Sequence, residues 1–98
     1  MIKSVYGKNT VIEQMVNSET ENGWELIDFT KDRFGNLAIL TTDDTCTCGK
    51  IRYTYHSKSF EAGEDITPYL ETELSSGYEY YKSVGGYYGY TTLTRKKL

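Results

Sequence analysis

The stretch Gly23-Trp24-Glu25-Leu26-Ile27-Asp28-Phe29 decides the fold that we predict, because it carries the features of a helix end followed by a strand. Gly supplies the left-handed backbone conformation that closes many helix C-termini. The aromatic and branched residues after it favour an extended strand. A related stretch, Gly77-Tyr78-Glu79-Tyr80-Tyr81, follows in the second half of the sequence. One chain therefore contains the same junction twice.

The offset that places Gly23 on Gly77 also aligns other glycines and aromatic residues along the chain. Turn glycines and aromatic residues that recur in register are typical of an internal repeat. A chain of 98 residues has room for one hydrophobic core. We therefore predict a single domain, 1–98, made of pseudo-repeats 1–42 and 51–98 with a polar connector at 43–50. The aligned pairs are Ile12/Ile66, Glu19/Glu73, Gly23/Gly77, Glu25/Glu79, Gly35/Gly89, Tyr6/Phe60, Trp24/Tyr78 and Phe34/Tyr88.

Local signals in the first pseudo-repeat predict the order β-α-β-β. Thr10, with Glu13 three residues later, has the pattern of a helix capping box. Strands are predicted at 2–6, 24–29 and 37–41, with a turn at 32–36 between the last two. The spacing of apolar residues predicts one buried helical stripe, which consists of Val11, Ile12, Met15 and Val16.

The second pseudo-repeat predicts the same order of elements. A strand covers 51–56 and extends toward 60, and Thr67-Pro68 begins a helix with Pro at its first position. That helix has an inward stripe of Tyr69, Leu70 and Leu74, and it ends at Gly77. Strands at 78–84 and 87–95 flank a tight turn at Gly85-Gly86. We predict an α+β fold in which a mostly antiparallel sheet carries two helices on one face.

The segment Gly23-Trp24-Glu25-Leu26-Ile27, placed between a helix and a hairpin, resembles a family of small uncharacterised bacterial and phage proteins. That family has a β-α-β-β unit and a Gly-Trp-Glu-Leu signature. The resemblance covers the first pseudo-repeat, and the second contains a divergent version of the signature, Gly77-Tyr78-Glu79-Tyr80. The resemblance implies the fold of the unit and carries no activity, cofactor or catalytic residue with it.

Charge and hydropathy exclude several classes of partner. The net charge of −3 opposes attachment to phosphate backbones, so we do not expect a nucleic-acid partner. No apolar run approaches the length of a membrane span, and the first residues lack the apolar core of a secretory signal. We expect a cytoplasmic protein in a bacterial cell, without a membrane partner.

Three residues are weak candidates for metal ligands: Cys46, Cys48 and His56. A zinc site normally has four ligands and wider spacing between its cysteines, and the chain has no further Cys or His. We therefore predict reduced thiols in a polar connector, no metal and no cofactor. The repeat-related Glu25 and Glu79 indicate outward strand positions rather than an acid–base pair, so we predict no enzymatic activity.

The tyrosines are the best functional lead, because six of the ten fall on two adjacent predicted strands. Side chains alternate between the two faces of a strand, so the six cannot all be buried. Exposed tyrosines are typical of protein interfaces, although base stacking and ordinary cross-strand pairing are alternatives. The predicted protein-binding residues are Tyr78, Tyr80, Tyr81, Tyr87, Tyr88, Tyr90 and Glu79.

We therefore expect a non-catalytic protein-binding module that self-associates or docks on a host or bacterial protein. Small acidic domains with a Lys, Asn, Ile and Tyr bias are typical of phage-encoded inhibitors from AT-rich genomes. The most concrete version is an inhibitor of a defence nuclease, an anti-CRISPR-like protein. The alternative is a protein that sequesters a small ligand or nucleotide in a pocket between the repeats.

Overall fold

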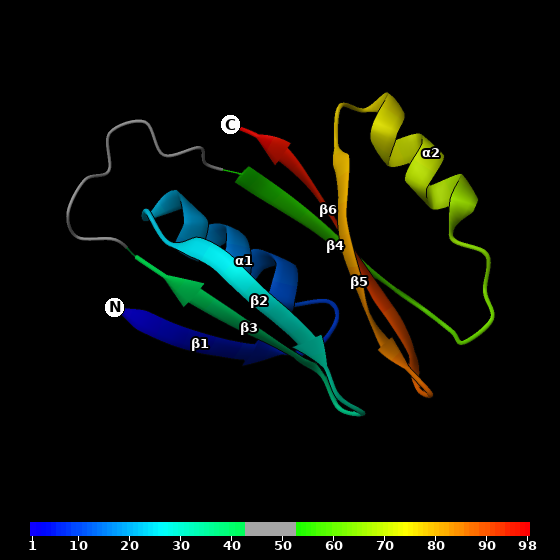
Figure 1. The fold of residues 1–98 in the computed structure, drawn as a ribbon, viewed down its shortest axis with the longest axis horizontal. Helices are drawn as coiled ribbons and strands as arrows, with labels where there is room; N and C mark the ends of the chain where they lie inside the picture. The colour runs from blue at the N-terminus through cyan, green and yellow to red at the C-terminus, as the bar shows by residue number, and fades with distance from the viewer. Residues whose placement is uncertain (43–52) are drawn as a thin grey trace.

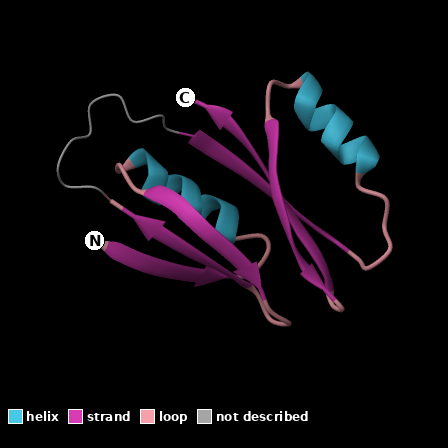
Figure 2. Cartoon of the chain, viewed as in Figure 1, coloured by secondary structure: helices cyan, strands magenta, loops and turns pink. Residues whose placement is uncertain are grey.

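The computed structural model describes residues 1–42 and 53–98, and Figures 1 and 2 show the arrangement of this part of the chain. The order β-α-β-β occurs twice there, so the predicted α+β class with antiparallel strands is confirmed. The origin of the two units by duplication stays a prediction. The elements are β1 (Ile2–Gly7), α1 (Ile12–Glu21), β2 (Glu25–Lys31), β3 (Asn36–Thr41), β4 (Tyr53–Phe60), α2 (Thr67–Ser75), β5 (Glu79–Gly86) and β6 (Gly89–Lys97).

The strands form two three-stranded sheets, with strand orders β1-β3-β2 and β4-β6-β5. The edge strands β2 and β5 lie side by side without a hydrogen-bonded ladder among the described residues, although Lys82 Nζ is 3.5 Å from Asp28 Oδ1. Each of these strands has a bulge at the same place in its unit, at Ile27 and at Tyr81. A bulge bends and twists its strand, which explains why these edges do not continue as one sheet.

Both helices end at the predicted glycines. Gly23 and Gly77 have φ angles of +94° and +90°, in the left-handed region that Gly adopts without strain. The residue after each Gly donates its N–H to the carbonyl oxygen four residues before the Gly, at 3.1 and 3.0 Å. These bonds satisfy carbonyl groups that the helix end would otherwise leave unpaired.

The helix starts differ from the prediction. Val11 occupies the N-cap position of α1 without a side-chain hydrogen bond, so the predicted capping box is wrong. The Glu13 carboxylate instead accepts the Ser57 N–H at 2.7 Å, because a long-range partner on β4 is within its reach. In α2 the helix begins at Thr67, with Ile66 as N-cap and Pro in the first turn.

The hydrophobic core lies between α1, the first sheet and the inner face of the second sheet. Two of its members, Tyr55 and Leu93, come from the second unit. Burial raises the pKa of Tyr55 to about 12, because removal from water disfavours the charged phenolate. The two units therefore share one core, which consists of Ile12, Val16, Leu26, Phe29, Ala38, Leu40, Tyr55 and Leu93.

Helix α1 also covers the free edge of β4. The Asn17 side-chain amide donates to the Tyr55 carbonyl oxygen at 2.8 Å, and its Oδ1 accepts the Tyr55 N–H at 2.7 Å. An uncovered edge strand presents unpaired backbone groups that invite association with other chains. The side chain of Asn17 therefore takes the place of a neighbouring strand at this position.

Helix α2 packs on the outer face of the second sheet through a polar cluster. Glu73 is its buried residue, and Leu74 of the predicted apolar stripe is 57% exposed, so the prediction is wrong for Leu74. Tyr69 and Leu70, the other two residues of that stripe, are half-buried. On the sheet face beneath, the Phe60 ring packs 5.4 Å from that of Tyr69. Beside this contact, Glu73 Oε1 accepts hydrogen bonds from Tyr69 Oη at 2.7 Å and Thr94 Oγ1 at 3.1 Å. His56 Nδ1 lies 2.9 Å from the same oxygen.

The Glu73 cluster predicts a specific loss of stability in acid. Burial raises the pKa of Glu73, but the hydrogen bonds from Tyr69 and His56 outweigh it and hold this pKa below its usual value. A depressed carboxyl pKa stabilises the fold above the unfolded-state pKa of about 4.3, and this contribution is lost as the pH falls through the folded-state pKa.

Urea unfolding of the native chain and of Glu73→Gln at several pH values measures this contribution. At about pH 7 we expect Glu73→Gln to be less stable by about 1–3 kcal/mol, because buried donors lose a charged acceptor. The difference in the free energy of unfolding between the native chain and Glu73→Gln should narrow as the pH falls toward about 2, where the native carboxyl is also protonated. A difference in the free energy of unfolding that stays constant with pH would contradict the role assigned to the ionised Glu73.

Candidate functional site

The turn of the β2–β3 hairpin is held by hydrogen bonds to Asp32 and leaves an aromatic ring exposed. Asp32 Oδ1 accepts the N–H groups of Phe34 and Gly35, each at 2.8 Å, and the Tyr6 hydroxyl at 2.8 Å. The hydrogen bond from Tyr6, followed by that from the Phe34 N–H, holds the pKa of Asp32 below its usual value. The Phe34 side chain is left 75% exposed at the tip of the hairpin.

The β5–β6 hairpin presents two tyrosines at its tip. The predicted turn at Gly85-Gly86 is wrong, because β5 runs to Gly86 and the turn residues are Tyr87 and Tyr88. Among the described residues the positive φ angles fall on glycines alone, so the tyrosines keep ordinary backbone conformations. Gly89 has φ +98°, and a Cβ there would lie 2.4 Å from the carbonyl oxygen of Phe60.

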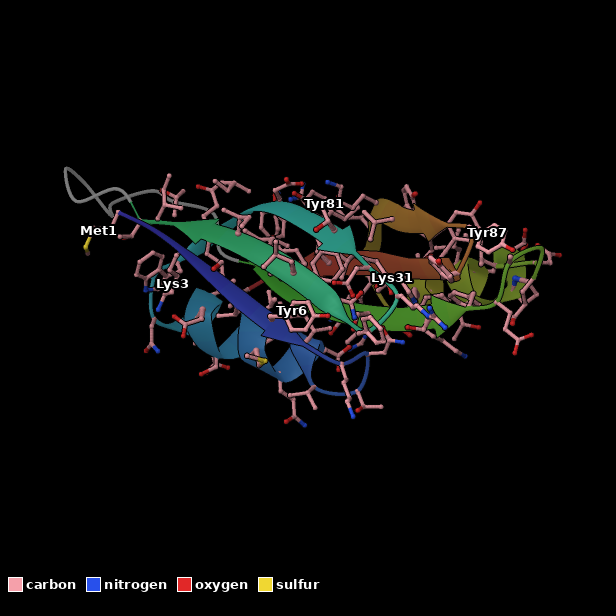
Figure 3. The ribbon with its side chains drawn as sticks, turned by 90° about the horizontal axis from the view of Figure 1, so that it is seen from below. Met1, Lys3, Tyr6, Lys31, Tyr81 and Tyr87 are labelled. Carbon is pink, nitrogen blue, oxygen red and sulfur yellow. The ribbon has the colours of Figure 1, made fainter. Side chains whose placement is uncertain are left out.

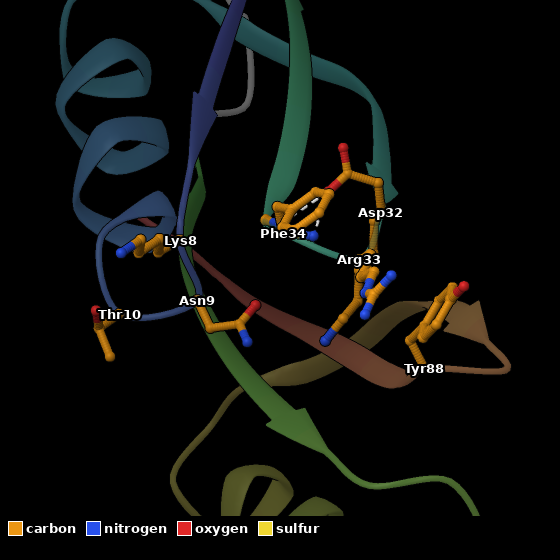
Figure 4. Close-up of a pocket in the computed structure, with 9 residues that line it drawn as sticks. Lys8, Asn9, Thr10, Asp32, Arg33, Phe34 and Tyr88 are labelled. Carbon is orange, nitrogen blue, oxygen red and sulfur yellow. Dashed lines mark hydrogen bonds between the residues drawn. The ribbon is translucent and has the colours of Figure 1, made fainter.

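The two hairpin tips lie next to each other at one end of the molecule (Figure 1). A groove of about 370 Å³ crosses the junction, and Figure 4 shows the Arg33 side chain between the rings of Phe34 and Tyr88. The Arg33 guanidinium carbon is 5.7 Å from the centre of the Phe34 ring and 5.8 Å from that of Tyr88. We call this end of the molecule the tip surface and define it by Lys8, Lys31, Arg33, Phe34, Tyr87 and Tyr88.

Lys31 lies where the two sheets meet below the tips (Figure 3). Its Nζ donates to Thr91 Oγ1 of the second unit at 3.2 Å. Within residues 1–42 and 53–98, no carboxylate oxygen lies within 4.0 Å of this ammonium group. Burial holds the pKa of Lys31 below its ordinary value, because partial removal from water disfavours the charged form.

Three of the predicted binding residues gather near the tip surface. Tyr87 is 90% exposed, and Tyr88 packs against it edge-on with ring centres 5.2 Å apart. Tyr90 follows on β6, where it pairs with Phe60 and remains partly exposed. The most exposed aromatic surface of the second unit is therefore its hairpin tip.

The other predicted binding residues lie away from the tip surface. Tyr81 is half-buried against the core, which removes it from the exposed aromatic group. Tyr80 remains accessible on the outer side of the second sheet. The contacts of the four residues are Tyr78 stacked on His56 at 3.9 Å, Tyr80 hydrogen-bonded to Ser83 at 3.1 Å, Tyr81 edge-on to Tyr55 at 5.8 Å, and Glu79 paired with Arg95 at 3.0 Å.

Sequence reasoning missed the contribution of the first unit to this surface, namely Lys8, Lys31, Arg33 and Phe34. A signal for it was present, because the alignment of the two pseudo-repeats places Phe34 on Tyr88. Both residues line the groove, each at the tip of its own hairpin. An aromatic residue at equivalent turns of two units indicates a shared surface when the turns meet.

Of the three weak candidates for metal ligands, only His56 lies in the part of the chain that the structure describes. Cys46 and Cys48 lie outside the described residues. His56 is held by Glu73 and by the Tyr78 ring, and no group of three potential ligands occurs in residues 1–42 and 53–98. In the same ranges, neither helix has the length and apolar character needed to cross a membrane.

No protein-family model, curated protein or solved structure gives a significant match to this chain. The resemblance to small proteins with a Gly-Trp-Glu-Leu signature therefore stays a prediction.

Proposed function

We propose that this chain is a protein-binding module that docks on its partner through the tip surface. The observation that supports the proposal is the exposure of Phe34, Tyr87 and Tyr88, large rings that two separate hairpins bring to one end. Large exposed apolar groups that gather at one place are typical of interaction sites. Tyr and Arg are also the residue types that most often dominate binding energy at protein interfaces.

The partner predicted from the sequence is a host or bacterial protein, or a second copy of the chain. The narrower expectation of a phage-encoded inhibitor of a defence nuclease rests on composition, and it stays a prediction. The cytoplasmic location and the absence of enzymatic activity stay predictions as well.

The alternative, sequestration of a small ligand between the repeats, receives less support from the geometry. The groove does lie between the two units, as that alternative requires. Sites that enclose small ligands usually measure about 300–1,000 Å³ and bury most of the ligand. The groove of about 370 Å³ and its neighbour of about 230 Å³ are open and lie at or below the small end of this range.

Affinity purification from the native host, with three forms of the chain as bait, tests the proposal. We expect the triple variant Phe34→Ser, Tyr87→Ser, Tyr88→Ser to retain less than about one hundredth of the partner, because interface hot spots contribute roughly 2 kcal/mol or more each. The control variant Ile2→Ser, Leu98→Ser removes two exposed apolar side chains far from the tips and should retain the partner.

All the positions changed here are at the surface, so each variant should unfold at nearly the native temperature. Equal recovery of the partner by the native chain and the triple variant would refute docking through the tip surface. Loss of the partner from the control variant alone would place the interface at the other end of the molecule.

A further inference from the structure

A buried polar network connects Asn9 and Lys31, two of the residues that line the groove between the two tips. Asn36 and Thr91 are almost completely buried, and Thr91 Oγ1 donates to Asn36 Oδ1 at 2.9 Å. Asn36 Nδ2 in turn donates to Asn9 Oδ1 at 2.6 Å. Lys31 Nζ donates to Thr91 Oγ1, so the ammonium group is positioned by both units. An ammonium has three N–H donors, and the described residues accept one of them.

The groove carries positive charge although the whole chain is acidic. Lys8, Lys31 and Arg33 line it, and the single carboxylate among its lining residues is Asp32. Both Asp32 oxygens already accept hydrogen bonds from the Tyr6 hydroxyl, and one also accepts two backbone N–H groups. Within residues 1–42 and 53–98, none of Lys8, Lys31 and Arg33 forms an ion pair, so these groups are available to an external anion.

The shape of the groove favours an extended ligand. The two hollows share Lys31, Asp32 and Tyr88 and therefore adjoin along the line where the hairpin tips meet. Neither is enclosed enough to bury a small molecule, but together they can take successive side chains of a peptide. The rings of Phe34 and Tyr88 provide apolar walls on either side of Arg33.

We propose that this groove binds an acidic, extended segment of a protein partner, with Lys31 and Arg33 contacting its carboxylate groups. The inference rests on the proposed function and names the chemistry of the segment that docks. Arg can hold a carboxylate through two parallel hydrogen bonds, and Lys31 supplies a point charge fixed by Thr91.

Selection of a random dodecapeptide library on the immobilised full chain tests this inference without knowledge of the natural partner. We expect the selected peptides to be enriched in Asp and Glu. Their affinity should fall about tenfold or more in Lys31→Met, which removes the charge but keeps the apolar stem. It should also fall in Arg33→Gln, and when salt is raised from about 50 mM to about 300 mM. Lys97→Met, at the far end of β6, is the matched control and should bind as the native chain does.

The remaining outcomes separate the inference from the proposed function. Neutral or basic peptides that bind Lys31→Met normally, but are lost from Tyr87→Ser, Tyr88→Ser, would overturn the acidic-segment inference and leave docking at the tip surface standing. Peptides insensitive to all these variants, or no selected peptide, would overturn the acidic-segment inference, whereas docking at the tip surface is tested separately by the affinity purification. Thermal stabilisation by inorganic phosphate or ATP that disappears in Lys31→Met would assign the groove to a small phosphorylated ligand and overturn the inference.

Discussion

Replacing Phe29 by Ala is expected to lower the free energy of unfolding by about 3–5 kcal/mol. Phe29 lies on β2 with its ring 1% exposed, in the core that both units share. Truncation to Ala removes the apolar surface of the ring and leaves a cavity that the surrounding sheet and helix fill only in part. Because a domain of this size is typically stable by about 5–15 kcal/mol, such a loss is a large fraction of the total.

The exposed Phe34 of the same hairpin is the matched control for Phe29. Phe34→Ala removes the same atoms from the tip, where the ring is 75% exposed, and should change stability by less than about 0.5 kcal/mol. Phe29→Leu keeps most of the volume and should lose about 1–2 kcal/mol, which remains measurable if Phe29→Ala is too unstable to purify. Urea unfolding at about 25 °C compares the three variants, and equal losses for Phe29→Ala and Phe34→Ala would contradict the described core.

Replacing Asn17 by Ala is expected to cost about 2–4 kcal/mol, although Asn17 lies on a helix and is only partly buried. Its side chain satisfies both the N–H and the C=O of Tyr55 at the edge of β4. Leaving a buried backbone group without a partner costs about 1–3 kcal/mol, and here two groups are affected. The higher helix propensity of Ala offsets only about 0.5 kcal/mol of this loss.

The control for Asn17 is its exposed neighbour on α1, in the variant Gln14→Ala, which should be within about 0.5 kcal/mol of the native chain. Asn17→Asp keeps the acceptor for the Tyr55 N–H but places a carboxylate against the Tyr55 carbonyl, so it should also be destabilised. Hydrogen exchange adds a local readout, because the Tyr55 amide should lose protection in Asn17→Ala. Native stability in Asn17→Ala would show that water replaces the side chain at no cost.

The junctions of the fold were predictable because they depend on local chemistry. Gly23 and Gly77 end their helices in the predicted way, because this cap depends on the positive φ angle of the Gly and on hydrogen bonds to the helix that precedes it. Strand and helix order followed from the same signals. The capping box at Thr10 was wrong for the opposite reason: Glu13 has a better partner in Ser57, on a strand of the other unit.

Tertiary packing decided the features that the sequence pattern left open. Leu74 was predicted to face inward from a helical stripe, but Glu73 takes the buried position on α2, where Thr94 on the sheet below donates to it. The alternation of side chains along the strands could not identify the exposed tyrosines. The turn lies at Tyr87 and Tyr88 instead of Gly85-Gly86, and a bulge at Tyr81 interrupts the alternation on β5. The groove depends on two hairpins from different units, so its cationic residues were not predictable as a group.

Site-specific photo-cross-linking in the native host tests the tip surface most directly. Benzoylphenylalanine is placed at Tyr87 in one version of the chain and at Ile2, an exposed position at the other end of the first sheet, in a second version. The tip surface predicts one discrete protein adduct from position 87 and none from position 2. An adduct from position 2 without one from position 87 would contradict the account.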